Sequence, residues 1–121
     1  MNWDFNSDRP IYTQLVEQIS VAIVSGTYKP GEKLPSVREL AAQAGVNPNT
    51  MQRAMAELET EGLLFTQRTA GRFITQDEAR IGQIKGELAA RHIREFLSIM
   101  AQIGYTRQEA AALVMESQLE E

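Results

Sequence analysis

Two short amphipathic patterns occupy residues 36–64, with a glycine between them. In each pattern, apolar side chains recur every three or four residues, the spacing that places them on one buried face of a helix. The residues that we expect to be buried are Val37, Leu40, Ala41, Met51, Ala54, Met55 and Leu58. Gly45 lies at the break, where a residue that is free to take a positive φ ends a helix. The pattern predicts two helices joined by a tight turn, the arrangement of a helix-turn-helix.

Each of these helices begins with a capping signal. Ser36 is followed three residues later by Glu39, the spacing of a capping box. Asn47 precedes Pro48, and proline suits the first helical position because its φ is already helical. The polar side chains that remain outside the second helix start are Asn49, Thr50, Gln52 and Arg53. Arginine pairs with guanine, and Asn or Gln with adenine, so this helix is expected to read DNA bases.

A longer amphipathic pattern precedes the helix-turn-helix. It starts after Pro10 and ends at Gly26, which predicts a first helix of about four turns. The residues on its apolar face are Ile11, Leu15, Ile19, Ala22 and Ile23, whereas Gln14 lies off that face. Before it, the alternating Trp3-Asp4-Phe5 either pairs with a sheet edge or packs its two aromatic rings.

After residue 62 the pattern changes to short β-prone runs. Residues 63–66 and 72–75 flank a turn and predict a hairpin, with Gly71 at a position that needs an unusual φ. Because an isolated hairpin is marginally stable in water, it must pack on the helices, and we expect Phe65 and Phe73 to make that contact. Three helices and a hairpin predict a winged helix-turn-helix domain over residues 1–75, in an α+β, mainly α, chain.

Residues 76–121 are predicted to form a helical tail. A Thr75-x-x-Glu78 capping box opens a helix that ends near Ile103, and Thr106 caps a second one. The inward residues of that last helix are expected to be Ala110, Leu113, Val114 and Leu119. The apolar stripe of the tail is too broad for one small domain to cover, so we predict a symmetric homodimer. The interface is expected to include Ile84, Leu88, Phe96, Met100 and Leu113.

The charge of the chain changes this picture in part. A net charge of −4 is not typical of a nucleic-acid binder. However, residues 77–121 hold eight acidic and five basic side chains, whereas residues 62–76 contain Arg68 and Arg72 and no acid. An acidic protein can therefore still present a basic edge, on which these arginines enter the minor groove or contact the DNA backbone.

Several function classes are excluded or disfavoured by what the sequence lacks. There is no cysteine, hence no disulfide or cysteine-ligated zinc site, and no apolar run long enough to cross a bilayer, so a cytoplasmic protein without a membrane partner is expected. His92 is the only histidine and belongs to no catalytic set, and no phosphate-binding loop is present. We predict no cofactor, no metal and no enzymatic activity. The remaining alternative is a winged helix that contacts proteins without binding DNA sequence-specifically.

Linked motifs identify a family resemblance over residues 10–75. They read Pro10-Ile11-Tyr12-x-Gln14, Tyr28-x-Pro30-Gly31-x-x-Leu34-Pro35-Ser36-x-Arg38-x-Leu40-Ala41, Gly45-Val46-Asn47-Pro48-Asn49-Thr50 and Glu57-Leu58-x-x-x-Gly62-Leu63. The chain resembles the GntR family of bacterial transcription regulators, and its short tail is similar to that of the YtrA-like subfamily. The resemblance implies a repressor of transcription that dimerises through the tail and lacks a large ligand-binding domain.

The resemblance also implies DNA contacts at Ser36, Arg38, Asn47, Asn49, Thr50 and Gly71. Many relatives carry arginine two positions after this threonine, where this chain has Gln52 followed by Arg53, so either residue reads the base. If four arginines in each subunit met phosphates, the salt slope of binding would reach at most about −7. The operator is expected to be an inverted repeat of double-stranded DNA. An effector, if one exists, would bind between the tail helices or under the wing.

Overall fold

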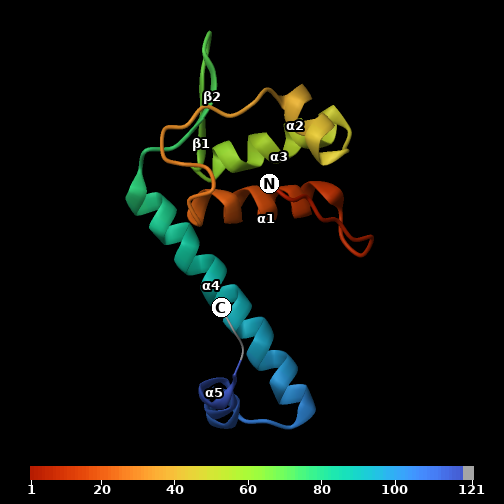
Figure 1. Cartoon of the computed structure of the whole chain (residues 1–121), viewed down its shortest axis with the longest axis vertical. Helices are drawn as coiled ribbons and strands as arrows, with labels where there is room; N and C mark the ends of the chain where they lie inside the picture. Colours follow the sequence, from red (N-terminus) through yellow and green to blue (C-terminus); the bar gives the residue numbers. More distant parts are fainter. Residues whose placement is uncertain (119–121) are drawn as a thin grey trace. The chain divides into compact units, whose positions relative to one another are not determined.

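The computed structural model describes residues 1–118 and contains two compact units. We call Met1–Lys85 the N-terminal unit and Gly86–Glu121 the C-terminal unit. The elements, labelled in Figure 1, are α1 (Ile11–Val24), α2 (Val37–Ala44), α3 (Pro48–Thr60), β1 (Leu64–Gln67), β2 (Gly71–Ile74), α4 (Glu78–Ile103) and α5 (Arg107–Glu116). This order confirms the predicted fold class, a mainly helical winged helix-turn-helix followed by two helices. The predicted division after residue 75 lies just before α4, whose first turns belong to the N-terminal unit.

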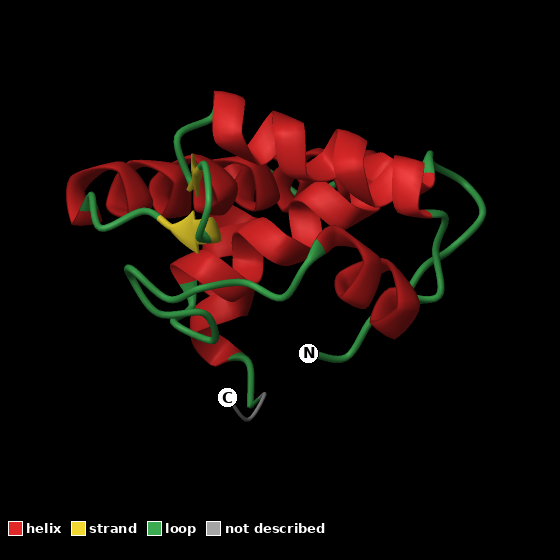
Figure 2. Cartoon of the chain, turned by 90° about the horizontal axis from the view of Figure 1, so that it is seen from above, coloured by secondary structure: helices red, strands yellow, loops and turns green. Residues whose placement is uncertain are grey.

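The core of the N-terminal unit lies where α1 and α2 pack against α3. Figure 2 shows the small sheet, in yellow, beside the red helices. The predicted apolar faces are confirmed, except that Val37 and Ile11 are only half-buried. The fully buried large side chains are Leu15, Ile19, Ile23, Leu40, Met51, Met55, Leu58, Leu63 and Ile74. Burying such side chains stabilises the fold by roughly 1.5–3 kcal/mol each, so α3, which supplies three of them, is fixed to its neighbours.

The predicted helix caps are confirmed at three of the four helix starts. Ser36 and Glu39 form a capping box, as do Thr106 and Glu109, and the Asn47 side chain accepts a hydrogen bond from a backbone N–H of α3. The prediction for α4 was wrong by two residues. Asp77, rather than Thr75, accepts the hydrogen bond from the N–H of Arg80 (3.1 Å). The reason is that the Thr75 N–H is bonded to the Leu63 carbonyl, which extends the hairpin pairing and delays the helix.

The hairpin forms in the predicted place, but its two faces are exchanged. β1 and β2 pair antiparallel, with Leu64 opposite Ile74 and Phe65 opposite Phe73. Leu64 and Ile74 are buried, whereas Phe65 and Phe73 stack on each other with ring centroids 5.7 Å apart, and Phe65 is exposed. The expectation that the two phenylalanines anchor the hairpin was therefore wrong. Because side chains alternate across a strand, the burial of Leu64 and Ile74 puts Phe65 and Phe73 on the other face of the hairpin.

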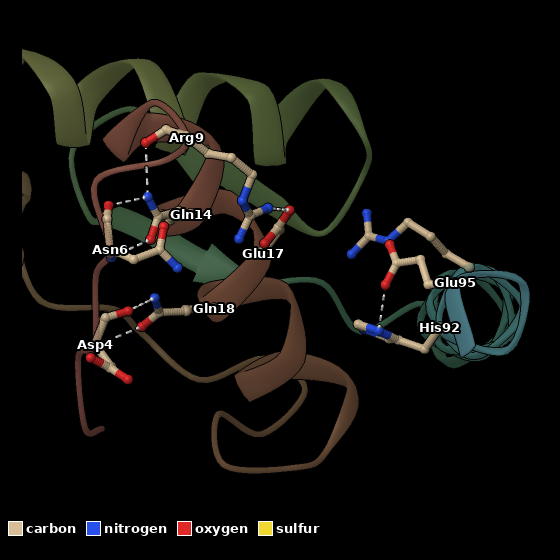
Figure 3. A network of polar contacts seen from close by, with 9 residues as sticks. Asp4, Asn6, Arg9, Gln14, Glu17, Gln18, His92 and Glu95 are labelled. Carbon is tan, nitrogen blue, oxygen red and sulfur yellow. Dashed lines mark hydrogen bonds and ion pairs between the residues drawn. The ribbon is translucent and has the colours of Figure 1, made fainter. Parts of the chain in front are cut away.

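The segment before α1 lies along that helix and is held by two glutamines (Figure 3). The side-chain amide of Gln14 donates to the carbonyls of Asn6 and Arg9 (both 2.9 Å) and its oxygen accepts from the Asn6 N–H (3.0 Å). Gln18 makes the equivalent pair of bonds with the backbone of Asp4. Gln14 is therefore buried, contrary to the prediction, because its side chain completes the hydrogen bonds of this extended segment.

The aromatic pair at the chain start follows one of the two predicted alternatives. Trp3 and Phe5 stack with centroids 6.2 Å apart, and neither belongs to a strand.

The C-terminal unit contains the rest of α4, followed by α5, and leaves most of its apolar side chains exposed. Ala110 is buried as predicted, but Leu113 and Val114 are 40% and 54% exposed, so their expected inward position was wrong within one chain. Leu119 lies outside the described residues. The exposed large apolar residues of this unit are Ile93, Phe96, Ile99, Ile103, Tyr105, Leu113, Val114 and Met115. No helix in the described part of the chain is long and apolar enough to cross a membrane.

Candidate nucleic-acid interface

The outer face of α3 is polar and carries no carboxylate in its first two turns. Asn49, Gln52 and Arg53 are exposed, Thr50 is half-buried beside them, and Met51 and Met55 are buried. The first acid of α3 is Glu57. The N-terminal half of α3 therefore offers hydrogen-bonding groups and one positive charge to a partner, without a negative charge of its own.

The starts of α2 and α3 both present backbone amides. The Ser36 hydroxyl accepts from the Glu39 N–H (3.1 Å) and still has a proton to donate. Asn47 Oδ1 accepts from the Asn49 N–H (2.7 Å). Arg38, in the first turn of α2, is exposed and has no ion-pair partner within residues 1–118. The positive ends of two helix dipoles and one guanidinium at α2 together favour an anionic partner such as a phosphate.

The β1–β2 hairpin, which we call the wing, is connected to α3 through one carboxylate. Glu59 accepts hydrogen bonds from the Thr66 hydroxyl of β1 and from Nε of Arg72 of β2 (3.0 Å). The Thr66 hydrogen bond, together with the hydrogen bond and charge of Arg72, lowers the pKa of Glu59 below its usual value. This network fixes the hairpin on α3. Of the two predicted wing arginines, Arg72 is therefore paired within the chain, whereas Arg68 is exposed near the turn.

Gln52 and Arg53 contact different parts of the molecule. Nη1 of Arg72 lies 3.5 Å from Oε1 of Gln52, which connects Gln52 to the wing. The guanidinium carbon of Arg53 lies 3.6 Å from the ring centroid of Tyr12 in α1, which is cation–π geometry. The sequence did not predict either contact, because both join residues on separate elements.

An open groove of about 620 Å³ lies between the wing and the start of α2. It brings together the predicted residues Ser36, Arg68, Gly71 and Arg72. Gly71 has φ +110° at the start of β2, as predicted, and a side chain there would meet the Lys33 side chain at 3.2 Å.

Sequence reasoning missed Lys33, a further basic residue of this groove. The segment before α2 pairs with β2 through Leu34 N–H to the Arg72 carbonyl (2.9 Å) and Ile74 N–H to the Glu32 carbonyl (2.8 Å). This pairing places the exposed Lys33 side chain beside the hairpin turn. A signal was present, because the residue before proline is biased towards an extended backbone, and Leu34 precedes Pro35.

The residues predicted for a dimer interface are not equivalent in the structure. Ile84 is only 6% exposed within its own chain and therefore has little surface to give to a partner. Leu88 and Met100 are half-buried, and Phe96 and Leu113 are exposed. His92 lies on α4, where its Nδ1 is 3.4 Å from Oε2 of Glu95 (Figure 3). No cluster of possible metal ligands occurs among the described residues.

Comparisons with known proteins place these features in a family. A model of the gntR family of bacterial regulatory proteins matches residues 11–74. The HTH-type transcriptional repressor YtrA of Bacillus subtilis (strain 168) is 42% identical over 85 residues, which are 70% of this chain and 65% of that protein.

Two solved structures are also similar. A GntR family transcriptional regulator from Listeria monocytogenes is 41% identical, with a TM-score of 0.87 over 94% of this chain and 100% of that chain. The structure of AraR(DBD) in complex with operator ORX1 is 31% identical, with a TM-score of 0.57 over 62% of this chain and 96% of that chain. The first two of these relatives are named as regulators of transcription, and the third is a structure bound to an operator.

Proposed function

The chain belongs to the GntR family of bacterial regulatory proteins, and from this premise we propose that it represses transcription by binding an inverted-repeat operator as a homodimer. The observation that carries the proposal is the acid-free, hydrogen-bonding outer face of the first two turns of α3. A helix of this kind fits the major groove, where its side chains can reach the base edges. Repression is supported by the relative YtrA, which is named a transcriptional repressor.

We assign the contacts on this face to two groups. Asn49, Gln52 and Arg53 face the bases. Thr50, beside them, contacts the DNA at the edge of the groove. Around them, the groups suited to phosphates are Ser36, Arg38, Asn47, Lys33, Arg68, Gly71 and Arg72. Arg72 contributes mainly by holding the wing, because Glu59 already accepts its hydrogen bond. In this arrangement the phosphate contacts set position and affinity, and the base contacts set sequence preference.

Dimerisation would place two such faces on one DNA duplex. The support is the row of exposed apolar side chains in the C-terminal unit, with Phe96 and Leu113 among them. Because the two subunits of a symmetric dimer carry identical DNA-binding faces, they would contact two identical half-sites. These half-sites would lie one helical turn, about 34 Å, apart. A small-molecule effector would act by changing that spacing. We expect the protein in the cytoplasm, where the bacterial chromosome lies.

Selection of bound sequences from random DNA by the purified protein tests the proposal. The expected result is enrichment of one inverted repeat, with half-sites separated by about one helical turn. A selection without enrichment, combined with capture of protein partners through the same face, would favour the alternative of a winged helix that contacts proteins.

A further inference from the structure

Arg53 is held by an aromatic ring on another helix. Tyr12 lies in the first turn of α1 and is half-buried, while Arg53 lies in the second turn of α3 and is exposed. The guanidinium carbon lies 3.6 Å from the centroid of the tyrosine ring, within the range of a cation–π contact. No carboxylate pairs with Arg53 in the part of the chain that the structure describes.

This mode of contact leaves the binding groups of Arg53 available. The central carbon of the guanidinium lies over the tyrosine ring, and no guanidinium N–H of Arg53 donates a hydrogen bond within residues 1–118, so its N–H donors remain available. Stacking on Tyr12 also restricts the rotamers of a long side chain, so less freedom is lost when a ligand binds. Arg53 thus keeps its full charge and its fork of donors in one preferred position.

Gln52 and Arg72 show the opposite arrangement. Nε of Arg72 donates to Glu59 at 3.0 Å, so its edge and its charge are already engaged. The side-chain oxygen of Gln52 accepts from that same arginine at 3.5 Å. These two residues stabilise the junction between α3 and the wing, whereas Arg53 is oriented without being neutralised.

We propose that Tyr12 is a positioning residue that presents Arg53 to a guanine in the major groove, so that Arg53, rather than Gln52, is the main reader of a G·C pair in the operator. A guanidinium fork matches O6 and N7 of guanine, which is the base contact that this geometry suits best. The inference rests on the proposed function. Its new element is that a residue of α1, outside the helix-turn-helix, sets the sequence preference of α3.

The test measures base discrimination with the full chain. A duplex carrying the sequence selected by the wild-type protein is compared with duplexes in which each base pair is replaced in turn. We expect Arg53→Ala to lose preference for one G·C pair by roughly 5- to 150-fold. Tyr12→Leu is expected to lose about 2- to 5-fold at that same pair, the effect of an exposed cation–π contact.

Three controls separate positioning from a merely structural role. Tyr12→Phe keeps the ring and is expected to discriminate like the wild type. The double variant Tyr12→Leu, Arg53→Ala is expected to discriminate no worse than Arg53→Ala alone, because Tyr12 acts only through Arg53. Circular dichroism verifies folding, and Tyr12→Met, which also removes the ring, replaces Tyr12→Leu if the latter does not fold.

Two results would overturn the inference. One is a Tyr12→Leu protein whose base preferences equal those of the wild type, and the other is loss of the G·C preference in Gln52→Ala but not in Arg53→Ala. Failure of the proposed function looks different, because the wild-type protein would then select no sequence at all.

Discussion

The arginines and lysine of the proposed DNA face differ in what holds their side chains. Arg38 is exposed at the start of α2, Arg53 stacks on Tyr12, and Arg72 is bound to Glu59. Sequence reasoning found all three arginines and gave them different DNA contacts, but it did not find Tyr12 or Glu59 as their partners, because partners on other elements are not visible in local spacing. It missed Lys33 for the same reason, since only pairing with β2 brings that residue to the wing.

Arg38 gives the simplest prediction for a phosphate contact. Arg38→Ala should weaken binding to all DNA sequences in the same proportion, because a phosphate contact carries no base information. The salt slope should become less negative by about 0.9 for each phosphate that is no longer neutralised. The measurement is a salt titration by fluorescence anisotropy, with unchanged thermal unfolding. Arg94→Ala, which removes an exposed arginine of α4, is the control. Equal affinity of the Arg38 and Arg94 variants would exclude Arg38 from the interface.

Leu40 gives a prediction for stability rather than for binding. It is 1% exposed, so Leu40→Ala leaves a cavity in the core and should lower the free energy of unfolding by roughly 2–5 kcal/mol. Urea unfolding followed by circular dichroism measures this change, and Val21→Ala on the exposed side of α1 serves as the control. A Leu40 variant as stable as the Val21 variant would contradict the assignment of faces in α2.

At the scale of elements, the helices and their caps could be predicted almost completely, because each cap and apolar stripe is a local pattern. Where elements meet, local patterns were not sufficient. The hairpin buries Leu64 and Ile74 instead of the phenylalanines. Gln14 is buried because the segment before α1 forms hydrogen bonds with its side chain. Both differences depend on contacts between separate segments of the chain.

The link between α3 and the wing predicts a dependence of stability on pH. Hydrogen bonding to Thr66 and the nearby Arg72 lower the pKa of Glu59 in the folded state. Its contribution to stability is therefore present above the usual pKa of a glutamate and is lost as the pH falls through the lowered value. The contribution should be at most about 1 kcal/mol, since the pair is partly exposed.

Glu59→Gln isolates this effect. Urea unfolding should show the wild type more stable than the variant at pH 7, with the difference shrinking as the pH falls below the usual pKa of a glutamate and through the lowered pKa of Glu59. Glu57→Gln, which changes an exposed acid of α3 outside the wing contact, is the matched control. A stability difference that is constant over this pH range would show that the Glu59 charge does not hold the wing.

At the scale of the whole molecule, the exposed apolar side chains of the C-terminal unit require an explanation. Many exposed large apolar side chains on one helical unit are typical of an interface between subunits. The sequence predicted the broad apolar stripe of α4. It could not show that Ile84 is buried within its own chain while Phe96 and Leu113 remain exposed. That distinction depends on which part of α4 packs with the N-terminal unit's own residues.

The dimer can be tested by sedimentation. We expect the wild type to sediment as a dimer at micromolar concentration without DNA, and Phe96→Glu to be shifted towards monomer, because a buried unpaired charge is costly at an interface. Ser98→Glu is the control, since it lies two residues along and therefore on the opposite side of α4. A monomeric wild type, or equal behaviour of both variants, would contradict dimerisation through this face.

The central claim is that the α3 face of the N-terminal unit binds one DNA sequence in preference to others. Its most direct test is the affinity of the wild-type protein for the selected operator and for a shuffled duplex, at about 50 and about 200 mM salt. We predict a preference of at least about 10³-fold for the operator. If Lys33, Arg38 and Arg68 of two subunits each meet one phosphate, the salt slope should approach roughly −5. Equal affinity for both duplexes, or affinity that does not change with salt, would contradict this account.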